Sequence, residues 1–134
     1  FAVRNSGAEA VVEGCGSNGC EYMTGGTVAI LGPVGDNFAA GMTGGMAFIH
    51  DSDGSFERRV NPETVVWQRL ESPYWTEVLQ SLIRRHAEET HSAFAQRLLI
   101  DWKLEAGTFW QVVPKEMLNK LPQPLSAEPA ELRA

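Results

Sequence analysis

The stretch MTGGTVAIL (residues 23–31) is followed, 19 residues along the chain, by MTGGMAFI (residues 42–49). The same offset aligns glycines, apolar residues and asparagines in four columns: Gly7, Gly26 and Gly45; Gly16, Gly35 and Gly54; Val11, Ile30 and Ile49; Asn18 and Asn37. Agreement in all four columns is improbable by chance. The first part of the chain therefore contains an internal repeat.

A repeat of this length predicts a β-solenoid in which each repeat forms one coil. A unit near 20 residues is too short for a pair of helices, and short apolar runs lie between its glycines, at residues 10–12, 27–31 and 46–49. Stacked coils lie about 4.8 Å apart, so a corner that needs a positive φ favours glycine in every coil. The alternative is a β-sandwich or a flexible glycine-rich linker, but a linker lacks apolar ladders.

Two columns carry specific expectations for side chains. Val11, Ile30 and Ile49 are predicted to form an apolar ladder inside the coil. Asn18 and Asn37 are predicted to stack at a corner, because asparagine tolerates the left-handed region and its amide can bond along a ladder.

The start of the chain departs from this pattern. Glu9 falls in the column of Val28 and Ala47, so it marks either a coil of different parity or a side chain at an open end. The repeat pattern is already present where the sequence starts at Phe1, and it accounts for about three coils. This predicts an N-terminally truncated β-helix whose first coil is an open edge.

The amino-acid composition limits the classes of protein to which this chain can belong. The 134 residues, 43% of them hydrophobic, are enough for one core. With 11 basic and 17 acidic residues the formal charge is −6, which disfavours nucleic acid and membrane surfaces as partners. No apolar run approaches the roughly 20 residues of a membrane span, and Phe1 opens no leader pattern. With only two cysteines, the expected location is the cytoplasm.

The second half changes character, since only one of the 13 glycines follows Gly54. Asn61-Pro62 and Ser72-Pro73 each predict a helix start. The second start precedes one apolar stripe at helical spacing: Trp75, Val78, Leu79, Leu82, Ile83 and His86. Another helix is expected from about Ser92, and residues 109–113 predict a strand that Pro114 ends. The expected organisation is coils over 1–60, a helical segment over 61–120 and a proline-rich extended tail over 121–134.

Two motifs in the first half could suggest ligand chemistry. Residues 14–19 match the G-x-G-x-x-G pattern of a dinucleotide-dependent oxidoreductase, but a strand-like stretch follows where that motif needs a helix. Cys15 and Cys20 lack the further ligands of an iron–sulfur or zinc site. Small buried thiols are the better interpretation.

Two further patterns also favour structural roles. His86 and His91 are five residues apart and point about 140° apart on a helix, unlike the histidines of H-E-x-x-H. His86 is expected in the apolar stripe and His91 at a helix end. Residues 51–54 (Asp-Ser-Asp-Gly) predict a surface turn rather than a calcium loop. We therefore expect no catalytic, cofactor-binding or metal-binding residues in the chain.

Several stretches together resemble one known family. They are residues 4–8 (RNSGA), 12–14 (VEG), 19–26 (GCEYMTGG), 37–38 (NF), 41–45 (GMTGG) and 59–63 (RVNPE), with looser likeness at His86, Thr90, Ser92, 101–102 and 112–114. This set is similar to the C-terminal GXGXG region of the glutamate synthase large subunit. The resemblance is dense over residues 4–63.

The resemblance implies a right-handed parallel β-helix of ~19-residue coils followed by a short helical segment. It implies a parent oxidoreductase that makes two glutamates from glutamine, 2-oxoglutarate and reductant, taken from NADPH or ferredoxin. In that family a glutaminase domain with a cysteine nucleophile and a synthase barrel with FMN and an iron–sulfur cluster lie elsewhere in the large subunit. None of their catalytic or cofactor residues falls in the matched stretch.

The expected role is therefore a non-catalytic brace in ammonia assimilation, inactive alone. Its expected partners are the other domains of the large subunit and the NADPH-oxidising small subunit. The alternative is a stand-alone GXGXG β-helix subunit of an oxidoreductase complex, as in split archaeal glutamate synthases or in formylmethanofuran dehydrogenase.

Overall fold

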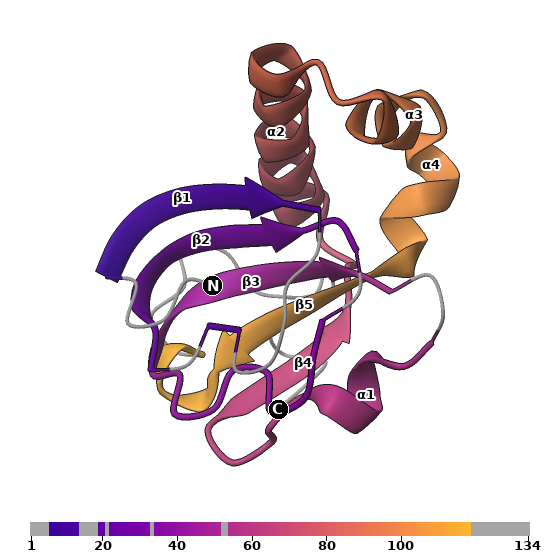
Figure 1. The fold of residues 1–134 in the computed structure, drawn as a ribbon. Coiled ribbons are helices and arrows are strands. Elements are labelled where there is room, and N and C mark those ends of the chain that lie inside the picture. Colours follow the sequence, from indigo (N-terminus) through magenta and orange to yellow (C-terminus); the bar gives the residue numbers. More distant parts are fainter. Residues whose placement is uncertain (1–5, 14–18, 21, 33, 52–53, 119–134) are drawn as a thin grey trace.

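A computed structural model of the chain contains one five-stranded mixed sheet with helices beside it (Figure 1). It describes residues 6–13, 19–20, 22–32, 34–51 and 54–118. The strands are β1 (Ser6–Val12), β2 (Thr24–Ile30), β3 (Gly44–His50), β4 (Val65–Arg69) and β5 (Phe109–Pro114), in the order β1-β2-β3-β5-β4. The first three strands are parallel, and β5 runs antiparallel to both β3 and β4.

Four α-helices accompany the sheet: α1 (Phe56–Arg59), α2 (Pro73–Thr90), α3 (Ala93–Ile100) and α4 (Trp102–Glu105). Two 3₁₀ turns follow, η1 (Ala106–Thr108) and η2 (Lys115–Met117). The helix starts predicted at Ser72 and Ser92 and the strand ending at Pro114 are confirmed. The helix start predicted at Asn61 is wrong, because Asn61 Oδ1 accepts the Glu63 backbone N–H in a turn that leads into β4.

Both faces of the sheet are covered, and each has its own apolar core. The first core lies under α1 and the loops between strands: Cys20, Met23, Val28, Ile30, Val34, Phe38, Ala39, Met42, Ala47, Ile49, Phe56, Val60, Val65 and Val112. The second lies under α2 and α3: Ala29, Leu31, Met46, Phe48, Trp75, Leu79, Leu82, Ile83, Ala87, Ala95, Leu98, Phe109 and Val113. Figure 1 shows α2, α3 and α4 grouped together, with α1 beside β4.

The predicted right-handed parallel β-helix is wrong. Within the described residues the sheet is open, and antiparallel β5 and β4 extend the same sheet beyond β3 instead of the three parallel strands closing into coils. The physical reason lies in the continuous apolar runs of β2 and β3, since successive side chains point to opposite faces and both faces are buried. Loops cover one face and helices cover the other. The segment 61–120 supplies two strands as well as three helices.

The 19-residue repeat nevertheless describes how β2 and β3 pair from Thr27 onward, whereas Thr24 pairs with Gly44 at an offset of 20. Ile30 lies opposite Ile49, as predicted. From Glu9 onward β1 pairs with β2 at an offset of 18, because the register shifts before Glu9. Val12 rather than Val11 therefore lies opposite Ile30, so the predicted place of Val11 in the ladder is wrong. The change of parity inferred from Glu9 is confirmed.

Backbone dihedral angles repeat with the same period. Gly26 and Gly45 have φ values of 90° and 82°, as their shared column predicted. Two further pairs 19 residues apart have positive φ: Cys20 (58°) with Ala39 (66°), and Tyr22 (54°) with Gly41 (67°). Three of these four residues are not glycine, so glycine columns alone could not reveal them.

The predicted asparagine corner is partly described. Asn37 has a φ of 62°, and its Oδ1 accepts the side-chain N–H of Asn61 at 2.8 Å. The neighbouring residue Phe38 joins the same two segments through its backbone. Its N–H donates to the Arg59 carbonyl, and its own carbonyl accepts the Asn61 backbone N–H. Asn18 lies outside the described residues. The stacking of Asn18 with Asn37 stays a prediction, and the Asn37 amide bonds to Asn61 in the loop before β4.

Candidate functional site

Strand β1 forms one edge of the sheet and β4 forms the other. An edge strand presents backbone N–H and C=O groups that lack a neighbouring strand, and proteins often protect such edges with charged side chains. Glu9 lies on β1, and Glu13 directly follows it. The candidate site is the β1–α2 seam, which consists of β1 with Glu13 and the residues of α2 that contact them.

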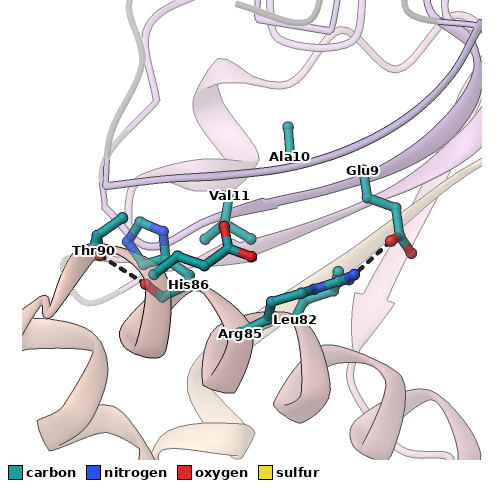
Figure 2. Close-up of a pocket in the computed structure, with 8 residues that line it drawn as sticks. Glu9, Ala10, Val11, Leu82, Arg85, His86 and Thr90 are labelled. Carbon is teal, nitrogen blue, oxygen red and sulfur yellow. Dashed lines mark hydrogen bonds and ion pairs between the residues drawn. The ribbon is translucent and has the colours of Figure 1, made fainter.

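The first contact of the seam is an ion pair. Arg85 of α2 donates to Glu9 at 2.8 Å, and each side chain is about half exposed, at 54% and 53%. Figure 2 shows these two side chains pointing toward one another between strand and helix. A pair this exposed contributes at most about 1 kcal/mol to stability. The pair connects α2 to β1 across the surface.

The ion pair lies between two adjoining hollows. One has a volume of about 490 Å³ and reaches His86 and Thr90, whose hydroxyl donates to the His86 carbonyl (Figure 2). The other has a volume of about 390 Å³ and reaches Tyr74. Both are lined by Glu9, Leu82 and Arg85. The surface beside the open edge is therefore hollowed along α2.

The second contact is a clasp centred on Glu13. Its Oε2 lies 3.0 Å from His86 Nε2 of α2, and the Ser92 hydroxyl donates to the same oxygen at 2.5 Å. Ser92 Oγ also accepts the Ala95 backbone N–H and so caps the N-terminus of α3. One carboxylate thus joins the end of β1 to α2 and α3.

The clasp lowers the pKa of the Glu13 carboxyl below its usual value. The hydrogen bond from Ser92 is the largest cause, followed by the hydrogen bond with His86, and desolvation acts in the opposite direction. Both hydrogen bonds favour the ionised carboxylate. Glu13 is therefore held in the form that accepts hydrogen bonds.

The same three residue types occur in nucleophilic triads, but the order of contacts here differs. In a triad the histidine lies between the nucleophile and the acid, so that it can take the hydroxyl proton. Here the carboxylate lies between Ser92 and His86, and Ser92 donates to Glu13. His86 contacts Glu13 in this arrangement, so the histidine does not take the base's place beside the Ser92 hydroxyl. The geometry is that of a structural clasp.

Replacing Glu13 by glutamine is expected to change how stability depends on pH. A carboxyl with a lowered folded-state pKa stabilises the fold above its unfolded-state pKa, and this contribution is lost as pH falls through the folded-state pKa. Glu13→Gln should cost less than about 1 kcal/mol at neutral pH, because Glu13 is 43% exposed. The variant should also lose less stability than the unmodified chain as the pH falls below the ordinary pKa of a glutamate carboxyl, because that pKa is lowered only where the clasp forms.

Urea unfolding at a series of pH values measures this difference. Two stability curves that stay parallel through the acid range would show that the clasp does not form.

The residues proposed from sequence do not gather into one site. His86 lies on α2 and joins the clasp, whereas His91 ends α2 with a φ of 55°, as predicted. Cys20 is fully buried, as predicted, and Cys15 lies with residues 14–18 outside the described residues. In the parts of the chain that the structure describes, no three His, Cys, Asp and Glu side chains lie close enough to hold a metal ion.

Asp51 has a larger role than the predicted surface turn. Its Oδ1 accepts the backbone N–H groups of Ser55 and Phe56 at 3.1 and 3.3 Å, and its Oδ2 accepts Trp110 Nε1–H at 2.8 Å. Asp51 therefore joins the start of α1 to β5. The turn predicted at residues 51–54 includes residues 52–53, which lie outside the described residues, and the partner on β5 is 59 residues away and leaves no local signal.

None of the helices in the described residues has the length and apolar character needed to cross a bilayer.

Comparison with known proteins identifies the class. A family model described as the GXGXG motif matches residues 1–115, and the chain belongs to this family. It is 62% identical to the NADPH glutamate synthase large chain of Azospirillum brasilense over 125 residues, which cover 93% of this chain and 8% of that protein.

Two further relatives point the same way. The chain is 54% identical to the chloroplastic ferredoxin-dependent glutamate synthase of Spinacia oleracea over 114 residues, 85% of this chain and 7% of that protein. It is 46% identical to the NADPH glutamate synthase large chain of Bacillus subtilis over 122 residues, 90% of this chain and 8% of that protein. The resemblance to glutamate synthase large chains is thereby confirmed. The chain spans less than a tenth of the length of these relatives.

Proposed function

We propose that this chain is a non-catalytic structural domain of a glutamate synthase large chain. The observation that carries the proposal is the 62% identity over 93% of the chain to a segment that makes up only 8% of a glutamate synthase large chain. The parent enzyme would convert glutamine, 2-oxoglutarate and reductant into two glutamates in the cytoplasm. Its FMN and iron–sulfur cluster would be held by other parts of the large chain.

The role of the domain would be to fix the spacing of the glutaminase and synthase domains. The polar groups of the seam support a structural role, because Glu13, His86 and Ser92 are engaged with one another in an order unsuited to nucleophilic catalysis. Two apolar cores, one on each face of the sheet, make the domain rigid enough to act as a spacer.

The open edge at β1 is the expected contact with the rest of the large chain. The backbone groups on that side of β1 need partners, and the two hollows along α2 leave room for side chains of a docking segment. Arg85 and His86 hold Glu9 and Glu13 beside the edge. The NADPH-oxidising small subunit is a further proposed partner of the complete enzyme.

An assay of the 134-residue chain tests the non-catalytic part of this proposal. Supplied with glutamine, 2-oxoglutarate and a reductant, the purified chain should form no glutamate above the uncatalysed background. It should also carry neither flavin absorbance nor iron. Glutamate formation by the chain alone, or stoichiometric bound flavin, would overturn the proposal.

A further inference from the structure

His50, the last residue of β3, is a buried histidine with an unsatisfied ring nitrogen. Its side chain is 6% exposed, and its Nε2 has no hydrogen-bond partner among the described residues. The Glu105 carboxylate of α4 faces this nitrogen, with Oε1 3.6 Å from Nε2. The separation is longer than the about 2.7–3.2 Å of a hydrogen bond. The two groups therefore face each other without being joined.

Two aromatic rings hold the imidazole in this position. Phe94 of α3 and Phe109 of β5 make T-shaped contacts with it, at centroid distances of 5.9 and 5.1 Å. Glu105 is less confined, since its side chain is 28% exposed. A shift of about 1 Å by its carboxylate would bring Oε1 within hydrogen-bond distance of Nε2.

The charge of His50 decides whether this shift is favourable. In the neutral ring, Nε2 presents either a lone pair, which repels a carboxylate oxygen, or an uncharged N–H. In the protonated ring it presents an N–H that carries positive charge, and such a bond to a carboxylate is about twice as strong as a neutral one. Histidine side chains ordinarily change charge between about pH 5 and about pH 8. The contact should therefore tighten as the pH falls through this range.

The other charged groups around His50 are engaged elsewhere. Asp51 follows it in the chain, but its Oδ1 accepts two backbone N–H groups and its Oδ2 accepts the indole N–H of Trp110, which packs against the first core. Arg97 of α3 lies over the Phe94 ring, 5.5 Å from its centroid, and its positive charge acts against protonation of His50. The strands paired with β3, which are β2 and β5, contain no charged residue.

The charged and titratable side chains of α2 and α4 nearest to these elements line surface hollows instead: Arg85, His86 and Glu89 beside β1, and Asp101 and Lys103 beside Gln80. Glu105 is thus the acidic group that can favour the protonated form of His50.

The segment that contains Glu105 is held to the sheet by few contacts. Neither α4 nor η1, which together cover residues 102–108, contains a buried residue. Figure 1 shows this segment leading from α3 into β5. Trp102 anchors one end through its ring contact with β5, and the Thr108 carbonyl anchors the other by accepting the Asp51 backbone N–H. Segments with so little buried surface open at low free energy, so one ion pair can change how often this one opens.

We propose that His50 and Glu105 form a pH-dependent latch. When His50 is protonated, Glu105 closes on Nε2 and holds α4 and η1 against the end of β3. When His50 is neutral, the ion pair is lost and the segment opens more often. The stabilisation is present at low pH and disappears as the pH rises, which is opposite in sign to the Glu13 clasp. The latch is a conformational property of the domain and does not depend on the proposed function.

Hydrogen exchange in the intact large chain, corrected for the intrinsic exchange rate at each pH, tests the latch. The peptide covering residues 101–108 should exchange about threefold or more slowly at about pH 5.5 than at about pH 8. Glu105→Gln keeps the shape of the side chain but removes its charge, so it should abolish this difference by accelerating exchange at the lower pH. The control Glu116→Gln makes the same change at an exposed position of η2 and should preserve the difference.

Three results would count against the latch. The first is equal exchange of this peptide at both pH values in the unmodified chain, or a pH dependence that survives Glu105→Gln. The second is acceleration by Glu105→Gln in the peptide covering residues 109–114, because the variant would then destabilise the sheet itself. The third is a pH response confined to the peptide covering residues 86–95, which would assign the effect to the Glu13 clasp. None of these results bears on the proposed function, which fails if the chain alone is catalytic.

Discussion

Gly44→Ala is expected to unfold the domain. A Cβ atom at residue 44 would lie 1.9 Å from the Thr24 carbonyl oxygen and 2.6 Å from its carbonyl carbon. Both atoms belong to the backbone of β2, where Thr24 pairs directly with Gly44 of β3. Backbone cannot rotate away as a side chain can, so β2 and β3 would have to separate at this point. Because the pairing of β2 with β3 supports both apolar cores, we expect a loss of about 4 kcal/mol or more.

Gly107→Ala is the matched control for this prediction. Gly107 lies in η1, and a Cβ atom there would have no heavy atom within 4 Å. Its stability should change by no more than about 0.5 kcal/mol. Urea unfolding followed by circular dichroism compares the two variants. Equal midpoints for Gly44→Ala and Gly107→Ala would mean that β2 and β3 do not approach as closely as described.

The repeated Met-Thr-Gly-Gly motif shows how far a sequence pattern predicts this fold. The 19-residue offset predicted parallel strands, the register of β2 on β3 from Thr27 onward and the positive φ values of Gly26 and Gly45, but Thr24 pairs with Gly44 one residue out of that register. It failed at the level of architecture, because a continuous apolar run does not reveal what covers each face of a strand. Here the covers are α2 and α3 on one side and loops with α1 on the other.

The β1–α2 seam was less accessible from sequence. Ser92 was foreseen as a helix start and His86 as part of a helical stripe, and both positions are confirmed. Their shared partner Glu13 lies 73 and 79 residues away from them. Such contacts depend on where α2 settles over the sheet, which no local pattern encodes. Glu9 did indicate an irregularity in β1, because it places an acidic residue in a column of apolar residues.

Loss of coupling between two activities is the other large effect that we expect. If the domain fixes the spacing of the glutaminase and synthase domains, then unfolding it should leave glutamine hydrolysis largely intact. In the proposed parent enzyme, synthesis of glutamate would depend on delivery of ammonia over a fixed geometry, and small misplacements of reacting groups can cost about a hundredfold in rate. Gly44→Ala in the intact large chain should therefore uncouple the two reactions.

The direct measurement is the amount of glutamate formed per glutamine hydrolysed by the intact large chain, compared between Gly44→Ala and Gly107→Ala. Proteolysis within the domain should first verify that only Gly44→Ala unfolds it. We predict a ratio about tenfold or more lower for Gly44→Ala and an unchanged ratio for Gly107→Ala. A Gly44→Ala enzyme with an unfolded domain and an undiminished ratio would contradict the proposal that this domain braces the synthase.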